Sequence, residues 1–322
     1  MTNVAVVGAA GYAGVELANI LKKHPHASVT GLYSSADFSV DAVANSGAEV
    51  VFLATPNEVS AEVVPQLLDR DMKVIDLSGA FRLTSPSLYP TWYGFSHEKP
   101  ELLGEAVYGL PEWCNGELKK ARLVANPGCY PTSILLALRP LTYILDREQP
   151  VICDSKSGVS GAGKKSDVSW SFAELYGNFK AYGVGSHRHE PEIRQGLRLG
   201  DRATLVFVPH LLPTVRGILS TMHVGFTHSV TDEEIVAIFA EAYAEAPFVR
   251  LLPPGEWPQT KYTVGSNCVH LQVAADDRSG RLVAVGAMDN LTKGTAGGAV
   301  QCMNLVLGLD EEAGLSTIGL AP

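Results

Sequence analysis

The feature that most constrains the fold is a glycine turn between an apolar strand and a helix at the start of the chain. Residues 4–7 (VAVV) predict a buried strand, the turn reads GAAGYAG, and residues 14–23 have helical periodicity. Gly8, Gly11 and Gly14 permit a tight turn and let a pyrophosphate approach the backbone N–H groups at the helix N-terminus. Strand, turn and helix in register predict a dinucleotide-binding βαβ unit, against the alternative of a turn with only a structural purpose.

Short apolar runs alternate with helical patterns as far as residue 128. Buried strands that alternate with helices form right-handed βαβ units and a parallel sheet. The sequence therefore predicts a Rossmann-type, doubly wound α/β domain over this first part of the chain. After the glycine turn, the predicted strands are 29–33, 50–54 and 73–77, and a further helix is predicted at 58–68.

The sequence pattern changes from residue 151 onward, where glycine-rich loops and β-rich stretches replace the alternation of strands and helices. Strands with long returns and few crossover helices indicate an α+β domain with a mixed sheet. A helix over 231–244 begins with a capping box formed by Thr231 and Glu234. The β-rich stretches are 203–208, 217–225, 268–274 and 282–287.

These patterns predict two domains. The first combines residues 1–128 with 291–322, because the small-residue-rich helix expected at 294–309 is suited to return and pack on it. The second spans residues 129–290. A chain of 322 residues is long enough for this arrangement.

Composition excludes several classes of protein. Hydrophobic residues make up 46% and charged residues 18% of the chain, so it is not generally disordered. Its formal net charge of −9 argues against a protein that coats nucleic acid or binds a membrane through a basic surface. No apolar run approaches the roughly 20 residues that span a bilayer, and no basic segment precedes the apolar N-terminus. We therefore expect a soluble, cytoplasmic protein without nucleic-acid or membrane partners.

Cys129 is the candidate nucleophile among five cysteines. The cysteines are odd in number and form no C-x-x-C pair, which disfavours a disulfide framework or a structural zinc site and favours a reducing compartment. In the segment NPGCYPT (126–132), Cys129 lies where a Pro-Gly turn meets an apolar helix, and the positive end of a helix dipole stabilises a thiolate. The other cysteines are expected in the core: Cys114, Cys153, Cys268 and Cys302.

A polar cluster in the segment HRHEPEI (187–193) is the candidate acid and base. His187 and His189 lie close to Glu192, which can orient an imidazole. Too few further His or Cys residues lie nearby to complete a zinc site, so no metal is expected. The sequence does not decide which histidine moves the proton.

Several smaller motifs suit an anionic substrate. The glycine-rich segment 157–165 (SGVSGAGKK) can form a backbone nest with lysines at its rim, and an ordinary glycine-rich surface loop is the equally open alternative. Arg82 follows the strand at 73–77, near the carboxyl edge where ligands bind open sheets. His210 and Arg216 supply further donors for a phosphate or a carboxylate.

The end of the second strand bears on the choice of cofactor. An acidic residue there binds the ribose 2′-hydroxyl of NAD, but this strand ends in Ser34 and Ser35, with no carboxylate until Asp37. Two hydroxyl groups suit a 2′-phosphate better, so the sequence favours NADP over NAD.

The motifs together resemble the N-acetyl-gamma-glutamyl-phosphate reductase family within the semialdehyde dehydrogenase group. They occur in family order over nearly the whole chain: GAAGYAGVEL, FLATPN, DLSGAFRL, NPGCYPT, KSGVSGAGK, HRHEPEI, PHLLPTVRGIL and DNLTKGTAGGAVQCMNL. The resemblance implies an NADP-binding domain, a catalytic domain with dimer or tetramer contacts, Cys129 as nucleophile and a base from the histidine pair. It also implies that Asn290 and Gly294 lie beside the nicotinamide.

The implied site is larger than the nucleophile and the histidines. The expected cofactor-binding residues are Gly8, Gly11, Tyr12, Ala13, Gly14, Ser34, Ser35, Pro56, Ser78, Gly158, Gly161, Asn290 and Gly294. The expected substrate-binding residues are Arg82, Asn126, Ser157, Ser160, His210 and Arg216.

The chain departs from the family pattern after the second strand. Only residues 34–49 separate Tyr33 from the segment VVFLATP, whereas the family usually has a much longer segment, often with an arginine beside the serines. No Arg or Lys occurs in this span, which weakens the expected contact to the 2′-phosphate.

The implied reaction reduces N-acetyl-gamma-glutamyl phosphate to the semialdehyde through a thioester on Cys129, with NADPH as hydride donor. Three alternatives stay open. The same chemistry can act on N-acetyl-aminoadipyl or aspartyl phosphate. Water instead of phosphate can resolve the thioester, as in a non-phosphorylating aldehyde dehydrogenase. The third alternative is an NADP-binding redox sensor that switches at Cys129.

Overall fold

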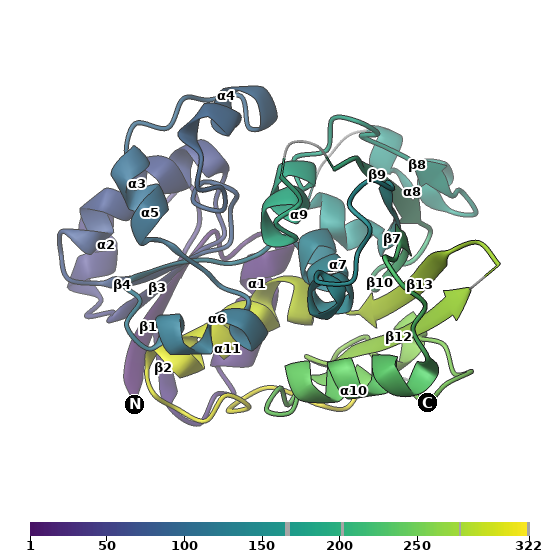
Figure 1. Cartoon of the computed structure of the whole chain (residues 1–322). Coiled ribbons are helices and arrows are strands. Elements are labelled where there is room, and N and C mark those ends of the chain that lie inside the picture. The colour runs from purple at the N-terminus through teal and green to yellow at the C-terminus, as the bar shows by residue number, and fades with distance from the viewer. Residues whose placement is uncertain (165–167, 201–202, 277, 321–322) are drawn as a thin grey trace. The chain divides into compact units, whose positions relative to one another are not determined.

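The computed structural model describes residues 1–164, 168–200, 203–276 and 278–320, which form two compact units (Figure 1). The first unit comprises Met1–Gly128 and Gly294–Ser316, and the second comprises Cys129–Lys293 and Thr317–Pro322. No helix of the described residues is both long enough and apolar enough to cross a membrane.

A six-stranded sheet in the order β2-β1-β3-β4-β6-β5 forms the centre of the first unit, and all its paired strands are parallel. The predicted parallel sheet is confirmed. The strand order reverses between β1 and β3, because β2 lies on the other side of β1. Open α/β sheets bind ligands at the carboxyl ends of the strands at such a reversal. The strands are β1 (Thr2–Val7), β2 (Ala27–Tyr33), β3 (Val50–Leu53), β4 (Lys73–Asp76), β5 (Val107–Tyr108) and β6 (Leu123–Ala125).

Helices cover both faces of this sheet because successive strand residues point to opposite sides. Val4 and Val6 of β1 are buried in a core with α1, α6 and α11, whereas Ala5 and Val7 are buried in a second core with α2, α3 and α5. The C-terminal helix α11 packs against α1 and α6. The helices are α1 (Tyr12–Leu21), α2 (Val40–Asn45), α3 (Asn57–Leu68), α4 (Tyr89–Trp92), α5 (Pro100–Glu105), α6 (Pro111–Leu118) and α11 (Gly297–Val306).

The second unit contains the predicted mixed sheet, with seven strands in the order β11-β12-β13-β10-β7-β9-β8. The pairs β7–β9 and β11–β12 are parallel, and the others are antiparallel. Helices α7, α9 and α10 pack against the strands. The elements are β7 (Val151–Gly158), β8 (Lys180–Ala181), β9 (Leu205–Leu212), β10 (Ile218–Gly225), β11 (Val249–Leu251), β12 (Val269–Asp276), β13 (Arg281–Met288), α7 (Cys129–Leu138), α8 (Phe172–Leu175), α9 (Glu190–Gly196) and α10 (Asp232–Ala242).

Local signals account for several of these elements. The capping box at the start of α10 is present, since the Glu234 N–H donates to the Thr231 hydroxyl and the Thr231 N–H donates to the Glu234 carboxylate. Residues Thr317–Leu320 pack in the second unit: Leu320 N–H donates to Val264 O, and the Cys268 thiol donates to Thr317 O.

Candidate active site

The glycine turn lies beside the carboxyl ends of β2 and β3. The N–H groups of Gly8 and Ala9 donate to Tyr33 O at 2.8 and 3.0 Å. Gly8 has a φ of +84°, and a Cβ there would lie 2.2 Å from Ala54 O. A Cβ on Gly14 would lie 2.2 Å from Gly8 O, so both positions require glycine.

Helix α1 begins at Tyr12 after Gly11, which offers no side-chain cap. The N–H groups of the first helical turn have no partner within the helix, and the dipole there favours an anion. The glycine turn and the open N-terminus of α1 therefore fit the pyrophosphate of a dinucleotide.

Loops after β3 and β4 complete this edge of the first unit. Pro56 precedes α3, and the neighbouring Asn57 accepts a hydrogen bond from the N–H of Gly79 at 2.8 Å. The Ser78 hydroxyl donates to Asp76 at 2.7 Å. Asp76 is fully buried, and this burial raises the pKa of its carboxyl group.

Arg82 and Asn126 lie together at the same edge. The Arg82 Nε donates to Asn126 O at 2.8 Å, and its NH2 group donates to Leu77 O at 2.8 Å. Arg82 is 8% exposed. Its guanidinium group therefore ties the end of β4 to the loop after β6, in addition to any contact with a substrate. The Asn126 amide reaches Thr295 O, next to Gly294, at 3.4 Å.

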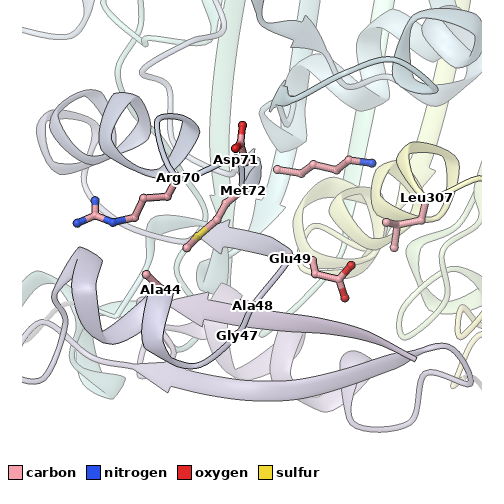
Figure 2. Close-up of a pocket in the computed structure, with 9 residues that line it drawn as sticks. Ala44, Gly47, Ala48, Glu49, Arg70, Asp71, Met72 and Leu307 are labelled. Carbon is pink, nitrogen blue, oxygen red and sulfur yellow. The ribbon is translucent and has the colours of Figure 1, made fainter.

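A separate pocket of about 640 Å³ lies at the opposite edge of this sheet (Figure 2). Glu49 and Lys73 line it at the amino ends of β3 and β4, together with Arg70, Asp71 and Leu307. Nucleotides bind open α/β sheets at the carboxyl ends of the strands. This pocket is therefore distinct from the dinucleotide site.

In the second unit, Cys129 is the first residue of α7 and is half-buried. The other four cysteines are buried, and burial raises the pKa of the Cys153 thiol. A thiol that is both accessible and at a helix N-terminus is the best placed to react as a thiolate. Cys129 alone combines these properties among the cysteines, all of which the structure describes.

Tyr130 connects the candidate nucleophile to the histidine pair. Its ring centroid lies 5.7 Å from His187 and 5.9 Å from His189, and the two histidine rings are 4.7 Å apart. The Tyr130 hydroxyl donates to His210 O and accepts from the Tyr182 hydroxyl, both at 3.1 Å. The structure thus brings the segments NPGCYPT and HRHEPEI together within the second unit.

The two histidines differ in their surroundings. Burial, followed by the charge of Arg188, lowers the pKa of His187 to about 4. Its Nδ1 accepts the N–H of His189 at 3.2 Å, so the neutral ring carries its proton on Nε2. His189 is 9% exposed, and Glu192, at the start of α9, is completely buried.

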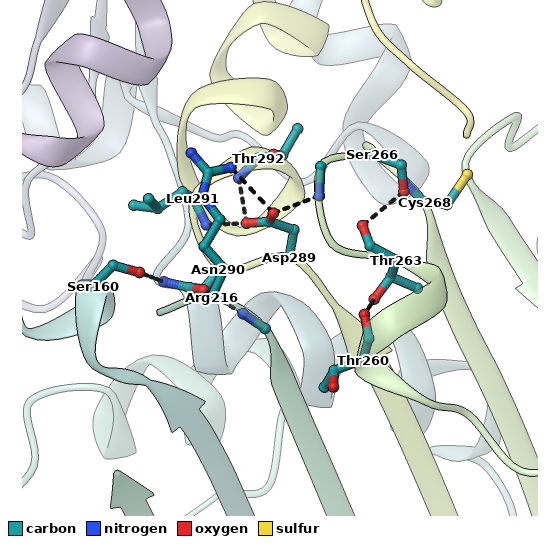
Figure 3. Close-up of polar contacts among 12 residues, drawn as sticks. Ser160, Arg216, Thr260, Thr263, Ser266, Cys268, Asp289, Asn290, Leu291 and Thr292 are labelled. Atoms are coloured by element: carbon teal, nitrogen blue, oxygen red, sulfur yellow. Dashed lines mark hydrogen bonds and ion pairs between the residues drawn. The ribbon is translucent and has the colours of Figure 1, made fainter. Parts of the chain in front are cut away.

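A polar network in the second unit holds Asn290, one of the two residues expected from the C-terminal motif (Figure 3). Asn290 accepts the N–H of Gly217 at 2.8 Å and donates to the Ser160 hydroxyl at 2.9 Å. Asp289 accepts from the guanidinium of Arg216 at 3.2 Å. Asp289 stands beside Asn290 but was not among the predicted site residues, because only the fold brings it to Arg216.

The predicted anion nest does not form from the start of the glycine-rich segment. The N–H groups of Gly158, Val159 and Ser160 donate to Gly217 O, Thr214 O and Val215 O, respectively. A Cβ on Gly158 would lie 2.7 Å from Arg216 N. The glycine therefore serves close packing of two backbone segments. Ser157, Gly161 and Lys164 belong to the same segment, and Lys165 lies outside the described residues.

Family comparisons agree with this division of the chain. The model of the semialdehyde dehydrogenase NAD binding domain matches residues 3–42 and 37–121. The model of the semialdehyde dehydrogenase dimerisation domain matches residues 129–290.

Solved structures share the fold. The aspartate semialdehyde dehydrogenase II of Vibrio cholerae, complexed with ASA, has a TM-score of 0.70 at 17% identity, covering 96% of this chain and 98% of that chain. The aspartate semialdehyde dehydrogenase of Candida albicans with NADP has a TM-score of 0.66 at 13% identity, covering 95% and 98%.

Relatives of much higher identity match end to end. The N-acetyl-gamma-glutamyl-phosphate reductase of Geobacter metallireducens is 45% identical over 348 residues, and that of Heliobacterium modesticaldum is 40% identical over 351 residues. Both alignments cover 100% of each chain. This chain belongs to the N-acetyl-gamma-glutamyl-phosphate reductase family of the semialdehyde dehydrogenases.

Proposed function

We propose that the chain catalyses the NADPH-dependent reduction of N-acetyl-gamma-glutamyl phosphate to N-acetylglutamate 5-semialdehyde and phosphate, a step of arginine biosynthesis. The observation that carries the proposal is the full-length identity of 40–45% to reductases of this name. A half-buried cysteine at the start of α7, next to a tyrosine that contacts two histidines, supports it.

In this proposal Cys129 is the nucleophile. Its thiolate attacks the acyl carbon, the C–S bond forms, and the bond from carbon to the phosphate oxygen breaks, which leaves a thioester and releases phosphate. NADPH supplies the hydride that reduces this thioester carbon. The C–S bond of the resulting thiohemiacetal then breaks to release the aldehyde and regenerate the sulfur. N–H groups at the start of α7 are proposed to stabilise the oxyanion.

We assign the proton transfers to His189. An acid or base works best when its pKa lies near the operating pH, and His187, with a pKa of about 4, stays neutral there. The Nδ1 of His187 also accepts the His189 N–H, which suits a residue that positions its neighbour. Glu192 is proposed to orient the histidine pair from the first turn of α9.

Other residues are proposed to bind the substrate and the cofactor. The anionic ends of the substrate are assigned to Arg82, Asn126, Ser157, Ser160, His210 and Arg216. The dinucleotide is assigned to the turn from Gly8 to Gly14, to Ser34, Ser35, Pro56 and Ser78, to Gly158 and Gly161, and to Asn290 and Gly294. Two features fit a bound dinucleotide: the approach that only glycine allows at Gly8 and Gly14, and the uncapped start of α1.

The second unit is proposed to join copies of the chain into a homodimer or homotetramer. It matches a dimerisation-domain model. In β7, β9 and β10, buried residues alternate with partly exposed ones, so one face of the sheet is less covered than the other. Five free cysteines suit the reducing cytoplasm, where we place the enzyme.

The deciding experiment follows NADPH oxidation with the acyl phosphates of N-acetylglutamate, N-acetylaminoadipate and aspartate in parallel. We expect N-acetyl-gamma-glutamyl phosphate to have the highest kcat/KM, and Cys129→Ala to abolish turnover. In the reverse direction, oxidation of the semialdehyde must require inorganic phosphate. Oxidation without phosphate would assign the chain to the non-phosphorylating dehydrogenases, and turnover by the Cys129→Ala variant would contradict the thioester route.

A further inference from the structure

The carboxylate of Asp37 lies at the end of strand β2, where Ser34 donates to it. Both the N–H and the hydroxyl of Ser34 donate to Asp37 Oδ1, at 2.6 and 2.7 Å. The preceding residue, Tyr33, accepts hydrogen bonds from Gly8 and Ala9 of the glycine turn. Asp37 is three residues beyond Ser34 in sequence, yet its carboxylate lies at the tip of β2, close to the dinucleotide turn.

The segment that carries this carboxylate has no basic residue. Residues 34–49 contain Asp37, Asp41 and Glu49 but no Lys or Arg. The guanidinium group of Arg70 pairs with Asp41. Asp37 is exposed, and the hydrogen bonds from Ser34 lower the pKa of its carboxyl group, so it is ionised at neutral pH.

The family model matches this region in two pieces. The NAD binding domain model matches residues 3–42 and 37–121 as two pieces, which overlap over residues 37–42. The alignment to the Heliobacterium relative runs over 351 residues, whereas this chain has 322, so the relative carries residues that have no counterpart here. The overlap of the two family matches lies just after β2 and includes Asp37.

We infer that Asp37 binds the ribose 2′-hydroxyl of NADH, and that this chain accepts NADH alongside NADPH. The inference rests on the proposed function for the reaction it serves. An acidic residue at the end of the second strand is the established partner of that hydroxyl in dinucleotide-binding folds. A carboxylate accepts at both oxygens, so two bonds from Ser34 on Oδ1 leave Oδ2 as an acceptor for the ribose.

The same carboxylate disfavours a 2′-phosphate. Two negative groups in contact repel each other, and a phosphate is bound most strongly by arginine or lysine, which this segment lacks. Ser34 and Ser35 can still donate to a phosphate, which is compatible with use of NADPH. We expect kcat/KM for NADH to lie within about tenfold of the value for NADPH.

The test combines kinetics with direct binding. Initial rates with NADH and NADPH are measured with N-acetyl-gamma-glutamyl phosphate, and calorimetry gives the dissociation constants of NAD⁺ and NADP⁺ on the resting enzyme. The variants are Asp37→Asn, which removes the charge but can still bond to Ser34, and Ser35→Arg, which adds a phosphate ligand at an exposed position. Asp41→Asn is the matched control, because Asp41 pairs with Arg70.

Asp37→Asn should lower the ratio of kcat/KM for NADH to kcat/KM for NADPH at least fivefold, mainly through KM. The dissociation constant of NAD⁺ should rise relative to that of NADP⁺. Ser35→Arg should tighten NADP⁺ binding, and Asp41→Asn should change neither cofactor. A wild-type preference for NADPH above about a hundredfold would overturn the inference, as would unchanged dissociation constants in Asp37→Asn. If neither cofactor supports reduction of this acyl phosphate, the proposed function fails, while the calorimetry still tests Asp37.

Discussion

Asp289 and Arg216 form an ion pair in which the carboxylate is completely buried while the guanidinium side chain is 23% exposed. The Asp289 Oδ2 atom accepts from Arg216 at 3.2 Å and from Gly265 N–H at 2.7 Å. Its Oδ1 accepts the N–H groups of Leu291 and Thr292 at 2.7 and 3.0 Å. One carboxylate therefore links three segments of the second unit and holds the Arg216 guanidinium group in place (Figure 3).

Asp289→Asn should destabilise the second unit by about 3 kcal/mol, because the amide NH₂ group must face buried N–H donors and Arg216 loses its charged partner. The same change should raise KM for the acyl phosphate more than it lowers kcat, since Arg216 becomes mobile. Urea unfolding and steady-state kinetics measure the two effects. Asp276→Asn is the matched control.

Asp276 pairs with Arg278 at 3.0 Å, but on the surface, where the Arg278 side chain is 91% exposed. Exposed ion pairs contribute little to stability. We therefore expect Asp276→Asn to unfold at the wild-type urea concentration. Equal effects of the two substitutions would show that Asp289 is no anchor.

The histidine pair gives a prediction in pH dependence. With its pKa lowered to about 4, His187 is neutral throughout the range from pH 6 to 8 and cannot produce a change in rate there. The shape of the kcat/KM profile between pH 6 and 8 should therefore persist in His187→Asn, whereas His189→Asn should lose at least a hundredfold in kcat. A changed pH profile in His187→Asn, together with a wild-type kcat in His189→Asn, would reverse the assignment.

The sequence predicted the strands and helix around the glycine turn because local signals determine them. It missed β7 as a strand because the segment combines apolar residues with serine and glycine. In the structure Ser155 is buried, and its hydroxyl donates to Ser220 across the sheet at 2.7 Å. Hydroxyl groups that satisfy each other across paired strands can occupy a core, but only the pairing shows it.

The residues of the candidate site also differ in whether the sequence alone can predict them. Cys129 and the histidine pair could be found from their local motifs, since each combines a reactive side chain with a turn and a helix start. Asp37 and Asp289 could not be found from a local motif. Asp37 reaches the end of β2 only because the backbone turns back toward Ser34, and Asp289 meets Arg216 across 73 residues of sequence.

Gly14→Ala tests the close approach inside the glycine turn. A Cβ there would lie 2.2 Å from Gly8 O, which is backbone and cannot rotate away. We expect the free energy of unfolding to fall by about 1–3 kcal/mol. The dissociation constant of the dinucleotide, measured by calorimetry, should rise at least tenfold. Gly104→Ala in α5 is the control, because nothing lies within 4 Å of its added Cβ. Wild-type binding by Gly14→Ala would show that the turn does not hold the cofactor.

Asp76 predicts how stability changes with pH. Burial raises the pKa of its carboxyl group in the folded state, so the folded protein binds this proton more tightly than the unfolded chain does. The stability that this preference contributes is present below the unfolded pKa and is lost as pH rises through the folded pKa. Asp76→Asn carries no charge to bury, so its stability relative to wild type should rise between pH 4 and pH 8. Urea unfolding of the two proteins across this range measures the difference. Asp71→Asn is the control and should show no such trend, because the Asp71 side chain is fully exposed. If the stability difference between Asp76→Asn and wild type does not change with pH, Ser78 and Arg82 fully compensate the buried charge.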